Sequence, residues 1–268
     1  MIHLDFAKRL AVKAGDIILK HMNQQVETES KTSGKDLVTE IDRMVEKFIQ
    51  QELTATFPNH QMLGEEEAFA SADKYKQVLD DFHSIPFIWI VDPIDGTNNF
   101  IQNIPGFVVS IALVSYGKPV VGVIYDPITD ELFYATKNGG SYLNEKKINV
   151  PHVDHLNESV IGTSFSSDTK VRSLTVRNIE MFLPKCRTIR VLGAAALNLA
   201  YVAKGRLTSF YHFQLSPWDV AAGILIISEA GGKVTTMKGT PYELSESSIL
   251  VSNGFIHQQM LDTIHVKN

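Results

Sequence analysis

Residues 92–97, which read Asp-Pro-Ile-Asp-Gly-Thr, carry the densest set of chemically useful groups in this 268-residue chain. The apolar run 88–91 before them predicts a short buried strand that stops at Asp92. The proline fixes φ and the glycine permits a tight turn, so we expect Asp92 and Asp95 to converge on one point. The amides after Gly96 are then available to an anion. The alternative is an ordinary polar turn with solvated aspartates.

Two further acidic positions could join this turn. Glu65 opens an acidic triplet after a possible strand end at residues 62–63, although such a triplet is most often a solvated surface run. Asp219 follows Trp218 at the start of an apolar helix, where an aspartate often serves only as the helix cap. Each segment taken alone leaves both interpretations open.

Together the three segments resemble the inositol monophosphatase family, within the magnesium-dependent, lithium-sensitive phosphatase superfamily, in both order and spacing. Glu65 matches the family's metal-binding glutamate, residues 92–97 match its aspartate-rich motif, and residues 218–223 match its C-terminal motif. Residues 35–42 resemble the N-terminal motif, and residues 193–195 resemble the substrate loop. The resemblance extends over nearly the whole chain.

The resemblance implies a metal-binding role for five residues. Asp92 would bridge two metal ions, Glu65 and the carbonyl of Ile94 would hold one ion, and Asp95 and Asp219 would hold the other. Four carboxylates gathered at one point repel one another, and some would take up protons unless a cation lay among them. Hard oxygen ligands favour Mg²⁺, with Mn²⁺ as a substitute. Two or three such ions can clamp a phosphate and activate water for in-line attack.

The resemblance also implies residues for the water and the substrate. Thr97 and Asp42 would orient the attacking water with help from Glu65, although Asp42 has the alternative role of a helix cap. Contacts to phosphate and substrate would come from Asp95, Gly96, Thr97, Gly193, Ala194, Ala195, His212 and Asp219, with a possible loop contribution from Lys35.

Two positions depart from the pattern of inositol-specific relatives. His212 stands where those relatives carry a glutamate that contacts the sugar-alcohol hydroxyls, and Ala194 stands where animal relatives commonly carry threonine. An imidazole can donate or accept hydrogen bonds and offers a flat, potentially cationic face, whereas a carboxylate only accepts. Ala194 has no hydroxyl and leaves more room. We therefore expect bulkier or more anionic monoesters to be accepted beside inositol 1-phosphate, unless His212 points into the core or the solvent.

These residues predict a phosphoric monoester hydrolase of the inositol-1-monophosphatase type with broad specificity. The favoured reaction converts inositol monophosphate to inositol and phosphate. The first alternative is the same chemistry on another main substrate: NADP(H) 2′-phosphate, fructose 1,6-bisphosphate, 3′-phosphoadenosine 5′-phosphate or histidinol phosphate. The second is a non-catalytic regulatory homologue, and the complete set of acidic residues argues against it.

Periodicity and turn residues predict the elements that would position these groups. Helices are expected at residues 4–22, from an N-cap at Thr39 onward, and at 173–183, 194–204, 220–229 and 255–266. Strands are expected at 88–91, 108–116, 120–125, 132–136, 141–143, 160–164, 188–192 and 249–252. Residues 23–35 are polar and predict a mobile loop.

The order of these elements divides the chain into two halves. Residues 1–155 have an α+β pattern and would carry most of the metal ligands. Residues 156–268 have an α/β pattern and would carry Asp219 and the substrate loop. No flexible linker separates the halves, so we expect one compact unit. The resemblance implies the five-layer αβαβα sandwich of the inositol monophosphatase and fructose-1,6-bisphosphatase type, usually as a homodimer.

Composition narrows the class of partner. A net charge of −5 gives no broad basic face for nucleic acid, so small molecules or other proteins are the expected partners, and the resemblance implies a small-molecule phosphate monoester. No run approaches the roughly 18 apolar residues of a membrane span, and the charged N-terminus does not resemble a signal peptide. Cys186 is the only cysteine, so no internal disulfide forms, which fits a cytoplasmic protein.

Overall fold

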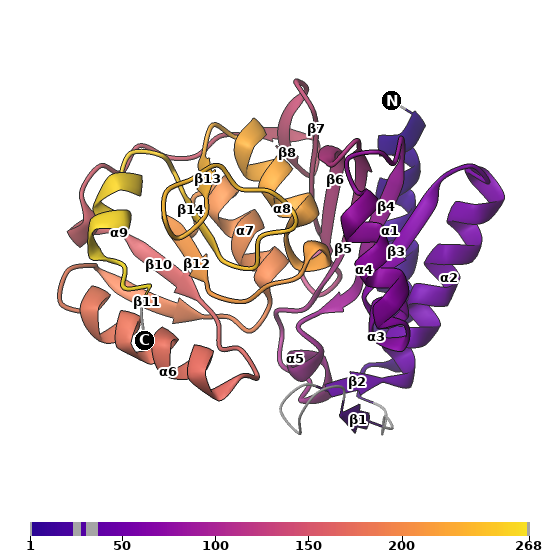
Figure 1. Ribbon diagram of the computed structural model, residues 1–268, viewed down its shortest axis with the longest axis horizontal. Coiled ribbons are helices and arrows are strands. Elements are labelled where there is room, and N and C mark those ends of the chain that lie inside the picture. The colour runs from indigo at the N-terminus through magenta and orange to yellow at the C-terminus, as the bar shows by residue number, and fades with distance from the viewer. Residues whose placement is uncertain (1, 24–27, 31–36, 267–268) are drawn as a thin grey trace.

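The computed structural model describes residues 2–23, 28–30 and 37–266, and its helices and sheets stack in five layers (Figure 1). One outer layer holds α1 (Ile2–His21) and α2 (Glu40–Thr56). The middle layer, between the two large sheets, holds α7 (Ala195–Lys204) and α8 (Pro217–Glu229). The other outer layer holds α6 (Thr169–Phe182) and α9 (His257–Thr263). The expected αβαβα sandwich is confirmed.

The first large sheet has seven strands in sequence order. They are β3 (Gln61–Gly64), β4 (Ile88–Asp95), β5 (Val108–Ser115), β6 (Lys118–Asp126), β7 (Glu131–Thr136), β8 (Gly140–Leu143) and β9 (Lys146–Ile148). Only β3 and β4 pair in parallel, and the remaining neighbours are antiparallel.

The second large sheet has five strands in the order β11-β10-β12-β14-β13. They are β10 (Val160–Thr163), β11 (Thr188–Val191), β12 (Ser209–His212), β13 (Lys233–Thr235) and β14 (Ile249–Ser252). Because β10 is parallel to both β11 and β12, the carboxyl ends of these three strands lie on one edge of the sheet.

Shorter elements complete the described part of the chain. They are the β1 (Thr28–Ser30) and β2 (Leu37–Thr39) pair, α3 (Glu65–Ala70), α4 (Ala72–Asp81), α5 (Thr97–Ile101) and a 3₁₀ turn, η1 (Leu156–Glu158). None of the helices in the described ranges combines the length and apolarity that crossing a membrane requires.

Strand β4 shows how the sequence separates two cores. All eight of its residues are buried, because helices cover both faces of the sheet. Ile88 and Ile90 point into the core shared with the middle helices, whereas Trp89 and Val91 point into the core shared with α1 and α2. A shift of one residue would exchange the side chains between the two cores, so the alternation fixes the register of β4. The positions of Asp92 and Asp95 at the end of the strand are fixed with it.

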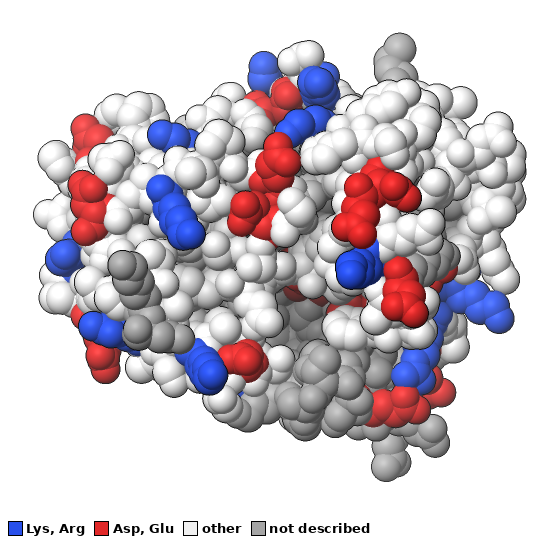
Figure 2. Space-filling model, viewed as in Figure 1, with Lys and Arg blue, Asp and Glu red and all other residues white. Residues whose placement is uncertain are grey.

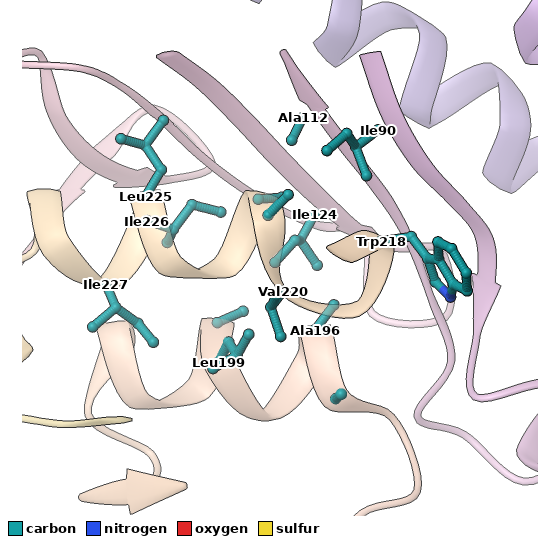
Figure 3. Close-up of a cluster of buried hydrophobic side chains, with 14 of the residues drawn as sticks. Ile90, Ala112, Ile124, Ala196, Leu199, Trp218, Val220, Leu225, Ile226 and Ile227 are labelled. Carbon is teal, nitrogen blue, oxygen red and sulfur yellow. The ribbon is translucent and has the colours of Figure 1, made fainter. Parts of the chain in front are cut away.

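The middle helices are apolar on nearly every side because a sheet lies on each side of their layer. Figure 3 shows α8 between the strands of the first sheet and α7, with Val220 and Leu199 among the side chains in this core. Nine of the thirteen residues of α8 are buried. An all-round apolar helix of this length is typical of a helix enclosed by other layers.

Several expected boundaries need correction. The strand predicted to stop at Asp92 instead runs to Asp95, with a break in its pairing to β5 between those two residues. The loop expected over 23–35 contains strand β1 in its described part. Helix α6 starts at Thr169, four residues before its expected start at 173, because Asp168 caps its first turn. Apolar periodicity did not indicate α4, whose residues are mostly exposed.

Candidate active site

A cavity of about 390 Å³ opens between the carboxyl ends of β4, β10 and β12 and the first turns of α3, α5, α7 and α8. Figure 2 shows a hollow in this face of the molecule with acidic atoms visible inside it. The acidic residues that line the cavity are Glu65, Asp92, Asp95 and Asp219. Strand ends and helix starts therefore bring together residues that are up to 154 positions apart in the chain.

Asp92, Asp95 and Asp219 form the acidic centre of the cavity. One carboxylate oxygen from each lies within 4.8 Å of the others. Asp92 Oδ1 accepts a hydrogen bond from the Ile94 amide at 3.1 Å, which orients it at the end of β4. Asp219 Oδ2 accepts from the Ser216 amide at 2.6 Å. Asp219 is therefore not the N-cap itself, which is Ser216, but completes the capping box from the third helical position, and the same carboxylate also belongs to the cluster.

Asp95 links the end of β4 to the start of α7. Its two oxygens accept from the amides of Ala195 at 2.9 Å and Ala196 at 2.6 Å. The pKa of Asp95 is raised to about 7, chiefly by burial and to a smaller extent by the charge of Glu65, although these hydrogen bonds lower it. Binding either a proton or a cation would stabilise a carboxylate in this position.

Glu65 begins α3 and lies on the cavity wall. The three-carboxylate cluster of the described residues does not include it, so the structure brings Glu65 to the same cavity as the aspartates without grouping it with them. Glu65 nevertheless interacts electrostatically with the cluster, because its negative charge contributes to the raised pKa of Asp95.

Thr97 and Asp42 are hydrogen-bonded to each other, with Thr97 Oγ1 donating to Asp42 Oδ1 at 3.1 Å. The same hydroxyl lies 3.0 Å from the Ile94 carbonyl oxygen, which is its alternative acceptor. Asp42 also accepts from the Thr39 amide at 2.8 Å, so it completes the capping box of α2 as well. Asp42 is fully buried and is not among the described lining residues, and its hydrogen bond from Thr97 connects it to the cavity wall.

Gly96 is the turn that allows this geometry. Its φ is +98°, and a Cβ there would lie 2.9 Å from the Gly106 carbonyl oxygen. A glycine is therefore required for both backbone conformation and space. Gly96, Thr97 and Asn98 line the cavity at the start of α5, as the sequence predicted for an anion-facing turn.

The substrate loop is only partly as expected. Gly193 and Ala195 line the cavity, but Ala194 does not. Only 1% of Ala194 is exposed, and its Cβ lies 3.2 Å from the Cβ position of Gly96. The prediction that Ala194 leaves room for substrate is therefore wrong, because its methyl group packs inside the protein. Lys35 lies outside the described residues.

His212 lines the cavity from the end of β12, with 4% of its surface exposed. Its Nδ1 accepts from the Gln214 amide at 3.1 Å, which leaves the hydrogen of a neutral imidazole on Nε2. Burial lowers the pKa of His212 to about 4. The expected cationic face is therefore wrong: at neutral pH the ring is an uncharged donor.

Sequence reasoning missed the opposite wall of the cavity. Ser164, Phe165 and Ser166 follow β10, and Gln214 follows β12. Ser166 Oγ donates to Gln214 Oε1 at 2.6 Å, which joins the two strand ends. The available signal was topological and partial: ligands commonly meet the carboxyl ends of parallel strands, and the strand at 160–164 was expected, whereas β12 was not.

The donor set fits divalent cations with hard ligand preferences. The cluster offers only carboxylate oxygens, two of its three residues are buried, and the described lining contains no lysine or arginine to balance the charge. Close buried carboxylates of this kind are stabilised by a bound cation. The arrangement can therefore hold metal ions beside a helix start that offers amide donors to an anion.

Comparisons with known proteins agree with this geometry. The sequence model of the inositol monophosphatase family matches residues 3–267. The fructose-1,6-bisphosphatase/inositol-1-monophosphatase of Thermotoga maritima is 36% identical over 265 residues, which cover 99% of this chain and 96% of the relative.

Solved structures show the same fold. The extragenic suppressor protein suhB of Bartonella henselae has a TM-score of 0.89 at 33% identity, and all of each chain is covered. SaIMPase-II with 2′AMP bound has a TM-score of 0.81 at 32% identity, with 98% of this chain and 93% of that chain covered. The chain therefore belongs to the inositol monophosphatase family, and it is a metal-dependent hydrolase of small phosphate monoesters.

Proposed function

We propose that this enzyme uses Mg²⁺ to hydrolyse phosphate monoesters whose alcohol part is uncharged, with inositol monophosphate as the leading substrate. One observation carries the proposal: three carboxylates within 4.8 Å of one another lie in a cavity whose described lining has no lysine or arginine. Among the described residues, neutralising the substrate phosphate then falls to bound cations and amide donors rather than to basic side chains.

Residues from both halves of the chain would share the work. Asp92, Asp95 and Asp219, with Glu65 and the carbonyl of Ile94, would hold two or three Mg²⁺ ions, which supply charge neutralisation and an activated water. Mn²⁺ has similar ligand preferences and is the expected substitute.

The protein's own groups would position the reactants. Thr97, held by Asp42, would orient the attacking water through its hydroxyl. Gly96 and Thr97, at the start of α5, would offer amides to the phosphate oxygens. The N–H groups of Ala195 and Ala196 already donate hydrogen bonds to Asp95. Helix α7 would therefore contribute by holding this metal ligand in place, and not by donating these two N–H groups to the substrate.

The substrate preference follows from the cavity wall. A second phosphate, as in fructose 1,6-bisphosphate or 3′-phosphoadenosine 5′-phosphate, would have no basic side chain in the described lining. The neutral groups at His212, Phe165 and Gln214 suit a polyol or a nucleoside better. A 2′-nucleotide is the second candidate, because a relative of the same fold has been solved with 2′AMP bound.

A phosphate-release assay over inositol 1-phosphate, 2′-AMP, NADP and fructose 1,6-bisphosphate tests this proposal. We expect activity with Mg²⁺, loss in excess EDTA, and higher kcat/KM for the first two compounds than for the bisphosphate. Full turnover in excess chelator would rule out the metal mechanism. A preference for the bisphosphate would show that the charge argument is wrong and would support the bisphosphatase activity named for the Thermotoga relative.

Family membership supports three further proposals. We infer that Li⁺ inhibits turnover, which the same assay measures. We also infer a homodimer, which light scattering after gel filtration checks, and a cytoplasmic location, which cell fractionation checks.

A further inference from the structure

Glu46 is a buried carboxylate to which the proposed reaction gives no role. It lies on α2 with 7% of its surface exposed, and it is not among the described residues that line the cavity. A buried carboxylate is costly unless its oxygens are hydrogen-bonded. Both oxygens accept from the backbone here: the Glu66 amide donates to Oε2 and the Glu67 amide donates to Oε1, each at 2.8 Å.

These two amides belong to the first turn of α3, the helix that begins at Glu65. The first N–H groups of a helix have no partner within it, and the side chain of the preceding residue usually caps them. That residue is Gly64, which has no side chain. Glu46 therefore supplies the missing cap from a neighbouring helix. Because both of its oxygens are engaged, it fixes the direction of the turn as well as its position.

The backbone at Gly64 admits this carboxylate only because it carries no Cβ. A Cβ at Gly64 would lie 2.4 Å from both Cδ and Oε2 of Glu46. Gly64 also pairs with Val91 in the parallel register of β3 and β4, so Glu65 and Asp92 follow at equivalent places. The cap and the strand register together set where Glu65 meets the cavity.

Helix α2 makes a second contact of the same kind. Asp42 lies four residues before Glu46, and both carboxylates are buried. Residues four apart lie on one face of a helix. On that face Asp42 accepts a hydrogen bond from the Thr97 hydroxyl, and Glu46 accepts hydrogen bonds from two amides in the first turn of α3. One turn of α2 thus contacts two separate parts of the candidate site.

We propose that Glu46 is a positioning residue for metal binding, which holds Glu65 at the cavity wall by capping the first turn of α3. The proposal rests on the proposed function, in which Glu65 is a metal ligand. The other end of α3 is packed against α8, where the Phe69 and Trp218 rings lie 5.9 Å apart. Loss of the cap therefore releases the first turn while leaving the helix attached to the protein.

Calorimetric titration of Mg²⁺ into metal-free protein, without substrate, tests this role. Glu46→Gln preserves the shape but offers one acceptor, and its NH₂ group would oppose a helix N–H. We expect Mg²⁺ affinity to fall by about tenfold or more, in line with changes to groups that orient metal ligands. The kcat/KM measured at low Mg²⁺ should fall with it and recover in part at high Mg²⁺. Glu52→Gln, on a more exposed part of α2, is the matched control and should change neither quantity.

Two more variants keep the test decisive. Glu46→Asp retains the charge but is one methylene too short to reach both amides, so it should weaken Mg²⁺ binding even if the glutamine variant fails to fold. The double variant Glu46→Gln/Glu65→Gln should bind Mg²⁺ no more weakly than Glu65→Gln alone, because residues that act through one ligand are not additive.

The possible failures are distinguishable. Unchanged Mg²⁺ affinity in both Glu46 variants, with only a lower Tm, would overturn the proposal and leave Glu46 a structural residue. A double variant much weaker than Glu65→Gln would also overturn it, since Glu46 would then act by another route. If Glu65→Gln itself binds Mg²⁺ normally, the ligand assignment in the proposed function is wrong, and the role of Glu46 falls with it.

Discussion

At the scale of single residues, the candidate site assigns two tasks to the same side chain. Asp95 caps α7 and also belongs to the acidic cluster, and Asp219 caps α8 while belonging to it too. Sequence patterns distinguish these tasks poorly, because capping alone explains an aspartate in the first turn of α8, and no local pattern shows that Asp95 caps the distant helix α7. Only the convergence of β4 and α8 shows that both interpretations hold at once.

Asp95→Asn tests the charge of the cluster while keeping the shape. We expect kcat/KM to fall at least ~100-fold, because the substitution removes a charge from the proposed metal site. Phosphate release at saturating Mg²⁺ measures this, and circular dichroism checks that α7 remains folded. Activity within twofold of wild type would mean that the acidic cluster is not the reaction centre.

Thr97→Ala tests the proposed orientation of water. Since Thr97 would act on the attacking water more than on the bound substrate, kcat should fall more than KM changes. Thr97→Ser is the control, because it keeps the hydroxyl that donates to Asp42 and should retain most of the activity. Equal loss in both variants would point to packing of the methyl group instead of the hydroxyl.

His212 tests the selectivity of the cavity wall. Its Nε2–H donates, so a polyol hydroxyl meets a donor there rather than the carboxylate acceptor of inositol-specific relatives. His212→Glu should therefore shift the ratio of kcat/KM for inositol 1-phosphate over 2′-AMP upward by roughly ten- to a hundredfold, in line with a contact of ~1–3 kcal/mol. An unchanged ratio would remove His212 from the specificity argument.

The buried imidazole also predicts a pH effect on stability. The folded-state pKa of His212 is lowered to about 4 from 6.5, so between these values the unfolded chain binds more protons. Stability should therefore fall as pH drops through this window. Thermal melts in EDTA at pH 7.5 and pH 5 should show a smaller loss for His212→Gln than for wild type. The exposed His155 gives a control, since His155→Gln should lose as much as wild type.

At the scale of elements, the sequence predicted most of what carries the chemistry. The short apolar run 88–91 indicated β4, and the expected N-cap at Thr39 indicated α2. The misses share a physical cause. Helix α3 is six residues long and is capped by Glu46, twenty positions from Glu66, so no local pattern announces it. Likewise, the burial of Ala194 depends on Gly96 from a distant segment, and the tautomer of His212 depends on the backbone conformation that directs the Gln214 amide at its ring.

At the scale of the whole molecule, one amide joins the two halves beside the cavity. Asn99 Nδ2 donates to the Gly106 carbonyl at 2.7 Å and to the Leu192 carbonyl at 2.8 Å. The first acceptor belongs to the first half, and the second precedes the substrate loop. Asn99 therefore helps to set the position of this loop, together with the hydrogen bonds from Ala195 and Ala196 to Asp95.

Asn99→Ala tests this connection. Two carbonyl oxygens lose their donor, so we expect the free energy of unfolding to fall by about 1–3 kcal/mol. KM should rise more than kcat falls, because the change loosens the substrate loop rather than the metal site. Urea denaturation and steady-state kinetics measure the two effects. A stability loss without a rise in KM would show that the loop keeps its place independently.

The walls of the cavity have separate origins, and this bears on how such an enzyme can diverge. The first set, Glu65, Asp92, Asp95 and Thr97 with Asp219 of α8, carries the proposed metal and water chemistry, whereas the second set, Phe165, His212 and Gln214, lies at or after the ends of strands of the other sheet. A duplicated gene could accumulate substitutions at the second set while selection preserved the first. New substrates would then be acquired by mutation of strand ends, with the hydrolytic step inherited unchanged.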